Sequence, residues 1–153
     1  MILIDIGNTN IVFAVSANNL IKKIIRINTK QNKIKLKTLI NSIIVNYSSI
    51  KKLDNDKIAI ISSVVPSLNY LIINILKKNL IKGLIIKSKD ILPFLKINYN
   101  LKEIGADRLA NSTAIIINKI SNSIVIDFGT ATTFEVIKNN IFLGGIIFPG
   151  INL

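Results

Sequence analysis

Acidic residues are scarce in this sequence, so the carboxylates that stand beside Gly-bearing turns are its first candidates for chemistry. The 153-residue chain has eight Asp and Glu residues against twenty Lys and Arg, with no His and no Cys. Ser-His and Cys-based nucleophiles, His-ligated metals and disulfides are therefore excluded, and acid–base work falls to carboxylates. Asp5 and Asp127 each lie near the end of an apolar run, two residues before Gly7 and Gly129.

A turn rich in Gly, Asn and Thr between two buried strands can bind phosphate. Its backbone N–H groups point into one concavity, and Gly lets a phosphate approach the main chain closely. An Asp at the mouth of such a turn can hold Mg²⁺, usually through water. The alternative is an ordinary hairpin turn, because Asn and Gly are also common in hairpins that bind nothing.

The two turns belong to segments that resemble each other. Ile2–Val15 can be laid without gaps on Ile124–Ile137, which matches Asp5 with Asp127 and the Gly of each turn. Internal duplication predicts two similar lobes with a nucleotide clamped between their hairpins. Chance similarity between two apolar hairpins is the alternative.

Asp107 is the third candidate carboxylate. It follows Gly105 at the predicted start of a helix, where the helix N-terminus favours an ionised carboxylate, as a general base requires. The neighbouring Arg108 offers a donor fork for carboxylate or phosphate. Position alone does not favour a functional role for these residues. Asp107 fits equally well as an ordinary acid at a helix start, Arg108 as a surface cation, and Tyr99 as an aromatic residue packed in a loop.

Hydrophobic spacing predicts the elements that must position these residues. Apolar steps of three and four indicate helices near 36–47, 68–76 and 109–117. Two further segments have a purely structural interpretation. Ser62–Pro66 fits a strand-to-helix junction with Pro in the first turn of the helix. Gly144–Gly150 fits a tight turn at the end of a strand. A loop is expected through Pro93 and Tyr99. The predicted strands are Met1–Ile6, Ile11–Val15, Leu20–Ile27, Lys57–Val65, Leu84–Ile86, Ser123–Asp127, Ala131–Lys138 and Ile141–Ile147. The order β-β-β-α-β-α-β-α-β-β-β predicts a mixed α/β protein.

Charge and hydropathy point to a soluble protein without nucleic acid. The formal net charge is +12, but the lysines are scattered and the chain is rich in Lys, Asn and Ile, which indicates A/T-rich codons and a solvated surface. A nucleic-acid binder is the alternative. Mean hydropathy is +0.51, yet charged or polar residues interrupt every apolar run before about 20 residues, and Met1–Ile21 has no basic leader. We expect neither a signal peptide nor a membrane anchor, and a cytoplasmic location.

Five segments carry a resemblance to a known family. Asp5–Asn10 and Asp127–Thr132 resemble the two phosphate motifs of the actin-like ATPase superfamily. The remaining segments resemble type III pantothenate kinases, in the family's order: Ser62–Pro66, Gly105–Arg108 followed by Asn111, and Gly144-Gly145 leading to Pro149-Gly150. The resemblance covers essentially the whole chain, as the N-terminal part of a longer family pattern.

The resemblance implies an α/β actin-like (ribonuclease H-like) fold with mixed sheets. Residues 1–120 would form a complete first lobe, and residues 121–153 the opening strands of a second. Those strands would leave one hydrophobic face and one sheet edge uncovered.

The resemblance also implies a reaction: ATP-dependent phosphorylation of pantothenate to 4'-phosphopantothenate, the first step of coenzyme A biosynthesis, by a homodimer. Asp107 would be the general base, Asp5 would lie near Mg²⁺ through water, and Asp127 would bind K⁺ or NH₄⁺. The implied ATP-binding residues are Asp5, Ile6, Gly7, Asn8, Thr9, Asn10, Ile11, Val12 and Thr130. The implied pantothenate-binding residues are Tyr99, Gly105, Ala106, Asp107 and Arg108.

Two alternatives to this kinase remain at the level of sequence. One is a non-catalytic regulatory accessory protein of the same family. The other is a different enzyme of the superfamily, such as a sugar kinase or a polyphosphate phosphatase.

Overall fold

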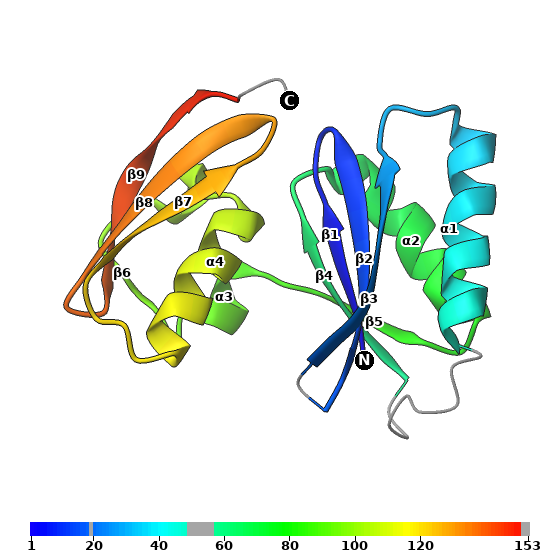
Figure 1. The fold of residues 1–153 in the computed structure, drawn as a ribbon, viewed down its shortest axis with the longest axis horizontal. Coiled ribbons are helices and arrows are strands. Elements are labelled where there is room, and N and C mark those ends of the chain that lie inside the picture. Colours follow the sequence, from blue (N-terminus) through cyan, green and yellow to red (C-terminus); the bar gives the residue numbers. More distant parts are fainter. Residues whose placement is uncertain (19, 49–56, 151–153) are drawn as a thin grey trace. The chain divides into compact units, whose positions relative to one another are not determined.

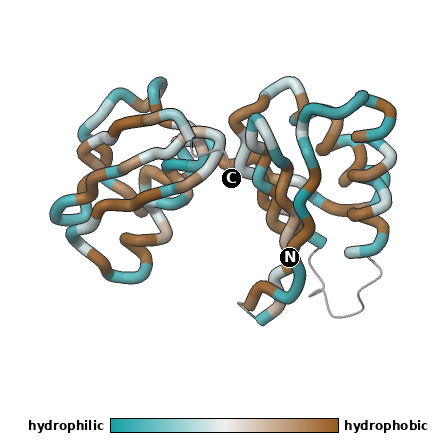
Figure 2. Tube along the Cα trace, turned by 45° about the horizontal axis from the view of Figure 1, so that its top comes forward, coloured by the Kyte–Doolittle hydropathy of each residue, from teal (hydrophilic) through white to brown (hydrophobic). Residues whose placement is uncertain are grey.

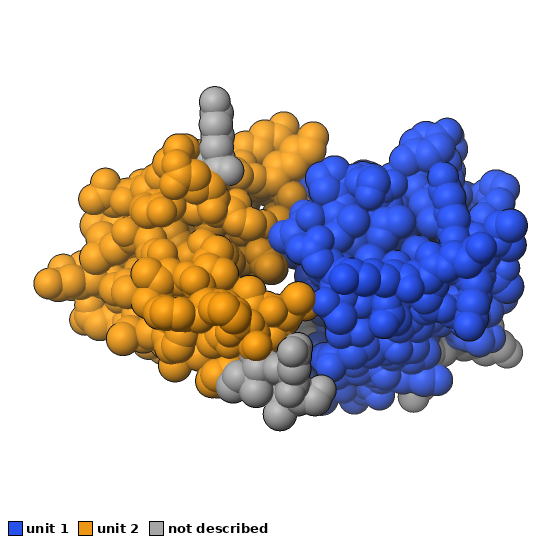
Figure 3. All heavy atoms as spheres, turned by 90° about the horizontal axis from the view of Figure 1, so that it is seen from above, with its two compact units in different colours: residues 1–85 blue, residues 86–153 orange. Residues whose placement is uncertain are grey.

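The chain forms two compact units, each with its own sheet. The computed structural model describes residues 1–18, 20–48 and 57–150 and divides the chain into Met1–Ile85 and Ile86–Leu153 (Figure 3). Helices and strands alternate as predicted for a mixed α/β protein. The segment expected to be a plain loop is instead structured: it contains α3 (Ser88–Ile91), β6 (Lys96–Ile97) and a 3₁₀ turn (Leu101–Glu103). These elements are too short for periodicity to reveal.

Unit 1 contains a five-stranded sheet in the order β3-β2-β1-β4-β5 (Figure 1). β1 pairs antiparallel with β2 and parallel with β4, so β1 lies at the centre of the sheet. The strands are β1 (Ile2–Ile6), β2 (Asn10–Ala17), β3 (Leu20–Asn28), β4 (Ile58–Ser63) and β5 (Lys82–Ile85). The predicted three-stranded meander at the N-terminus is confirmed.

Two helices cover one face of this sheet and close the core of unit 1. α1 spans Lys33–Ser48 and α2 spans Pro66–Lys78. Pro66 occupies the start of α2, where its missing N–H costs nothing, which confirms the predicted strand-to-helix junction. The alternating residues of β1 pack with the inward residues of both helices. Each fully buried Ile or Leu contributes roughly 1.5–3 kcal/mol.

Unit 2 contains a four-stranded sheet in the order β6-β9-β8-β7. Its strands β7 (Ser123–Phe128), β8 (Ala131–Lys138) and β9 (Ile141–Pro149) form an antiparallel meander. β9 runs through Gly144 and Gly145, so the interpretation of Gly144–Gly150 as a tight turn is wrong. Helix α4 (Ala106–Ile117) packs against β7 and β8. A small core gathers around Phe142 and Leu109.

The opposite face of the unit 2 sheet is apolar and exposed. Within the described residues, no strand pairs with the outer edge of β7, and the outward side chains of three strands lie open to solvent. Figure 2 shows hydrophobic residues along these strands. The exposed members include Ile124, Ile126, Phe128, Val136, Ile146 and Phe148. The predicted uncovered face and open edge are confirmed for the described part of the chain.

The predicted lobe boundary after residue 120 stays a prediction. The structure groups residues 86–120 with the second sheet, since α3, β6 and α4 pack on it. The described helices include none that is both long and apolar enough to cross a membrane.

Candidate active site

The first Asp-Gly hairpin is formed by β1 and β2, and residues after β3 brace its turn. Asp5 stands opposite Val12 and its side chain is exposed. Gly7 N donates to the carbonyl of Asn10 at 2.9 Å, and the hydroxyl of Thr29 donates to the carbonyl of Gly7 at 2.8 Å. The turn therefore has a fixed backbone with a carboxylate at its mouth.

Not all of the predicted ATP-binding residues can use their side chains. Ile6 and Ile11 are fully buried in the core of unit 1, where they pack between the sheet and its helices. Any phosphate contact at these two positions must come from the backbone. The exposed Asn8 and the half-buried Thr9 and Asn10 lie in the turn itself. The alternation of the strand therefore decides which members of the predicted segment face outward.

The second Asp-Gly hairpin is one residue shorter than the first. Across the first turn Ile6 pairs with Ile11, whereas across the second Phe128 pairs with Thr132. In the second turn Gly129 N donates to the carbonyl of Ala131 at 3.1 Å. The gapless alignment of the two segments is therefore wrong beyond the turn.

Leaving one residue of the longer first turn unmatched restores the correspondence. Phe13 then matches Phe134, and each pairs with the middle isoleucine of the preceding strand, Ile4 or Ile126. The shared register supports duplication of the hairpin. It also places Glu135 where the first hairpin has Ala14.

Helix α4 bonds to β7 and β8 through two of its polar side chains and carries Asp107 in its first turn. Gly105 caps the helix, and Asp107, in its first turn, accepts a hydrogen bond from Arg108 N at 2.8 Å. One turn later, Asn111 donates its amide to Oδ2 of Asp127 at 3.1 Å. The proposed base and the proposed cation ligand are therefore linked through neighbouring turns of one helix. Asp107 lies in the first turn of α4, at the positive end of the helix dipole.

Arg108 is buried, so the interpretation of this residue as a surface cation is wrong. Its Nε donates to Oε1 of Glu135 at 2.7 Å, and the two side chains are 8% and 0% exposed. Taking two charges out of water is expensive, and their close contact offsets that cost. The ion pair fastens α4 to β8.

Tyr99 and Arg108, both predicted to contact substrate, lie against adjacent residues of β9. A Cβ on Gly144 would come 2.7 Å from the Tyr99 ring, and a Cβ on Gly145 would come 2.8 Å from Arg108 Nη2. Gly144 has φ of +111°, a conformation that only Gly adopts readily. Tyr99 also packs edge-on against Phe142, so the packed-aromatic interpretation is correct as far as it goes.

Two residues of this region were given no role by sequence reasoning: Asn111 and Glu135. The signal for Asn111 was its place four residues after Asp107, on the same side of a helix. The signal for Glu135 was an acid at an alternating, inward position of an apolar strand, where a buried charge needs a partner.

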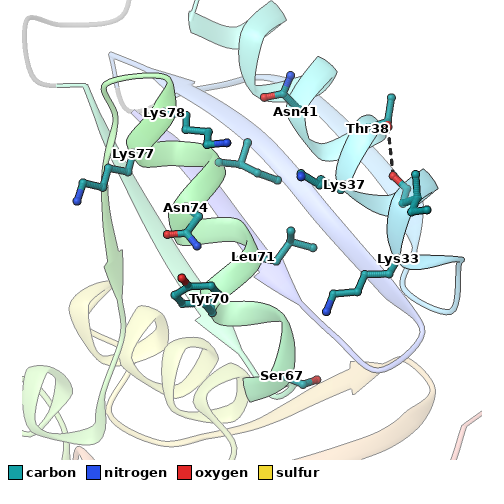
Figure 4. Close-up of a pocket in the computed structure, with 12 residues that line it drawn as sticks. Lys33, Lys37, Thr38, Asn41, Ser67, Tyr70, Leu71, Asn74, Lys77 and Lys78 are labelled. Atoms are coloured by element: carbon teal, nitrogen blue, oxygen red, sulfur yellow. Dashed lines mark hydrogen bonds between the residues drawn. The ribbon is translucent and has the colours of Figure 1, made fainter.

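A separate groove lies between α1 and α2 of unit 1 (Figure 4). Its volume is about 1120 Å³, and Lys33, Lys37, Lys77 and Lys78 are among its lining residues. No residue of the Asp5–Val12 hairpin lines it. The groove is thus distinct from the predicted phosphate turn.

The mixed sheets and the two Asp-Gly hairpins define an α/β protein of the actin-like ATPase fold class. Solved structures with a similar fold include a Campylobacter jejuni protein described as a Baf family transcriptional activator, with a TM-score of 0.55 and 25% identity over 99% of this chain and 55% of that one. Another is the ethanolamine utilization protein EutJ from Carboxydothermus hydrogenoformans, with a TM-score of 0.56 and 11% identity over 97% of this chain and 51% of that one.

The chain belongs to the type III pantothenate kinase family, whose model matches residues 1–153. A type III pantothenate kinase from Pelagibacter ubique is 40% identical over 152 residues, covering 97% of this chain and 58% of the relative. One from Brevibacillus brevis is 34% identical, covering 100% of this chain and 61% of the relative. The chain thus spans about three fifths of the length of these relatives.

Proposed function

We propose that this chain provides the catalytic machinery for ATP-dependent phosphorylation of pantothenate, which yields 4'-phosphopantothenate and ADP and begins coenzyme A biosynthesis. Family membership supports the substrate and the reaction. The observation that carries the proposal is helix α4, which holds Asp107 in its first turn and is bonded to the Asp127 hairpin through Arg108 and Asn111. We further propose that the working protein is a cytoplasmic homodimer.

In the proposed reaction, Asp107 accepts the proton of the attacking pantothenate hydroxyl. As that oxygen bonds to the γ-phosphorus of ATP, the bond from phosphorus to the bridging oxygen breaks and ADP leaves. Phosphoryl transfer depends chiefly on alignment and on neutralising charge. The turn after Asp5 would bind ATP phosphates, and Arg108 and Tyr99 would hold pantothenate.

The residues present fit the cations that the family resemblance implies. Asp5 is an exposed carboxylate at the mouth of its turn and would hold Mg²⁺ through water, where the ion neutralises phosphate charge. The described part of the chain has no group of three acidic, His or Cys side chains that would hold a metal by itself. Such a site suits an ion bound largely by water and substrate phosphates. Asp127 would hold K⁺ or NH₄⁺.

Replacing the proposed base tests the mechanism. We expect Asp107→Asn to lower turnover of pantothenate with Mg-ATP by about 10²- to 10⁴-fold, since it removes general-base catalysis. The change is nearly isosteric, so thermal unfolding should hardly move. Asp90→Asn makes the same chemical change at an exposed residue of α3 and should keep turnover within about twofold. Unchanged activity in Asp107→Asn would refute the assigned base.

Dependence on a monovalent cation tests the role of Asp127. We expect phosphorylation of pantothenate to require K⁺ or NH₄⁺ in addition to Mg-ATP. Asp127→Asn should weaken activation by the cation without changing the KM for pantothenate. Full turnover in buffers free of both cations would contradict this assignment.

A second candidate is a non-catalytic regulatory protein of the same family. It is favoured by the fold similarity to the C. jejuni protein, which is described as a transcriptional activator. An assay of ADP release separates the two candidates: pantothenate-dependent release supports the kinase, and binding of ATP without release supports the regulator. Including sugars and polyphosphate in the substrate panel tests the remaining superfamily enzymes.

A further inference from the structure

The Arg108–Glu135 ion pair is only half formed as a pair of hydrogen bonds. Arg108 Nε bonds to Glu135 Oε1, while Arg108 Nη2 and Glu135 Oε2 are buried without a hydrogen-bond partner among the described residues. Side-on Arg–carboxylate pairs usually make two parallel bonds. Here the Glu135 carboxylate accepts a hydrogen bond from Nε only, so Nη2 is not bonded to it.

That second group faces a stretch of strand without a side chain. A Cβ at Gly145 would stand 2.8 Å from Arg108 Nη2 and would also collide with the carbonyl of Phe134. Gly145 therefore lets the guanidinium approach the strand more closely than any residue with a side chain would allow. The neighbouring Gly144 does the same for the ring of Tyr99.

The hairpin itself does not need an acid at position 135. In the corrected alignment the first hairpin has the small apolar Ala14 at the equivalent place, and both hairpins keep the same pairing of strands. Glu135 is fully buried, and a buried carboxylate is costly unless it is paired. Its presence is therefore explained by Arg108 rather than by the fold of the hairpin.

We propose that Glu135 is the positioning residue for Arg108. It holds the guanidinium by Nε so that Nη2 lies against Gly145, and thereby sets the affinity of Arg108 for an acidic substrate. The inference rests on the proposed function, because the acidic substrate it names is pantothenate. Arg108 contacts the substrate in this scheme, and Glu135 acts only through Arg108.

Nuclear magnetic resonance of the arginine side chains tests the fixing of Arg108 without any substrate. The chain has two arginines, Arg108 and the exposed Arg26, so the Nε–H signals provide their own comparison. We expect the Arg108 Nε–H to exchange with water at least about tenfold more slowly than that of Arg26. Glu135→Gln should abolish this protection, and an equally fast Arg108 signal in the unaltered chain would overturn the proposal.

Kinetics then test the consequence for substrate. Loss of a residue that orients a metal ligand lowers metal affinity or activity roughly 10- to 100-fold. By analogy, we expect Glu135→Gln to raise the KM for pantothenate by roughly 10- to 100-fold. The KM for ATP should stay within about twofold of that of the unaltered chain. Arg108→Ala and the double variant should have similar KM values for pantothenate. Losses that multiply in the double variant would show that Glu135 acts independently and would overturn the proposal.

Matched variants exclude a merely structural effect. Glu103→Gln makes the same change at an exposed carboxylate of unit 2, bonded to Asn100, and should leave the Arg108 signal and both KM values unchanged. Should Glu135→Gln fail to fold, Glu135→Asp keeps the charge at a shorter reach and should show intermediate protection and KM. An Asp variant identical to the unaltered chain in both respects would contradict the proposed geometry.

The same experiments separate this inference from the proposed function. If the unaltered chain does not phosphorylate pantothenate, the proposed function fails, and the exchange of the Arg108 Nε–H still decides whether Glu135 fixes the guanidinium. If the chain is active and Glu135→Gln changes neither readout, the inference fails while the proposed function stands.

Discussion

The two hairpins share a sequence pattern and a strand register, yet their side chains have opposite environments. Ile2, Ile4 and Ile6 of β1 are 1%, 2% and 0% exposed. The equivalent residues of β7 follow the same alternation and are 65%, 47% and 66% exposed: Ile124, Ile126 and Phe128. An apolar strand pattern therefore identifies a face that seeks burial, but it does not determine whether that face is covered.

The difference lies in what packs against each hairpin. In unit 1, α1 and α2 cover the face formed by the alternating isoleucines of β1, and β4 pairs with its free side. In unit 2, α4 packs on the other face of the hairpin, where Arg108 meets Glu135, and in the described residues the outer edge of β7 remains unpaired. One hairpin is the centre of a closed core, and the other is the boundary of an open one.

The largest expected effect comes from truncating equivalent isoleucines of the two hairpins. Ile4→Ala should lower the free energy of unfolding by about 2–5 kcal/mol, because it leaves a cavity in a closed core. Ile126→Ala should change it by less than about 1 kcal/mol, because that side chain is half exposed. Urea unfolding followed by circular dichroism measures both. Equal losses would mean that the outer face of β7 is covered in solution.

A smaller effect is expected at the two turn glycines. A Cβ at Gly129 would meet the carbonyl of Ala131 at an ordinary 3.4 Å, whereas one at Gly7 would come within 3.1 Å of the carbonyl of Asn10. Gly129→Ala should therefore stabilise the chain by about 0.4–1 kcal/mol through the unfolded state, and Gly7→Ala should gain less or lose. Thermal unfolding checks the order of the two variants.

The same glycine variants sharpen the functional part of the comparison. If the turns bind phosphate, ATP affinity should fall in Gly129→Ala even though its stability rises, since the added methyl obstructs the approach of a ligand. Unchanged ATP affinity in both variants would indicate ordinary hairpin turns.

The smallest effect is confined to alkaline pH and probes the closed core of unit 1. Burial raises the pKa of the Tyr47 hydroxyl above its ordinary value of 10.0. A raised pKa means that the unfolded chain loses this proton first, so the associated stability is present below pH 10 and declines as pH rises further. Tyr47→Phe should lose less stability than the unaltered chain between pH 10 and 11. Tyr70→Phe, on the exposed surface of α2, should behave like the unaltered chain.

Much of the fold followed from local patterns, and the failures have identifiable causes. The meander, the helix start at Pro66 and the closing strands were predictable, because hydrophobic periodicity and the Gly and Pro residues that bound an element act over only a few residues. The one-residue difference between the two turns was not, since apolar strands align equally well in several registers. The short elements between Ser88 and Glu103 were missed because each is too short for hydrophobic periodicity to reveal.

The candidate site divides in the same way. The sequence by itself determined which residues are chemically capable: scarce carboxylates beside glycine turns, and an acid at a helix start. The assigned roles of Asp5, Asp107 and Asp127 stay predictions. Tertiary structure alone decided that Arg108 is buried against Glu135 and that Tyr99 lies against a glycine of β9. The physical reason is that residue type and spacing act along the chain, whereas desolvation and charge pairing depend on segments that only folding brings together.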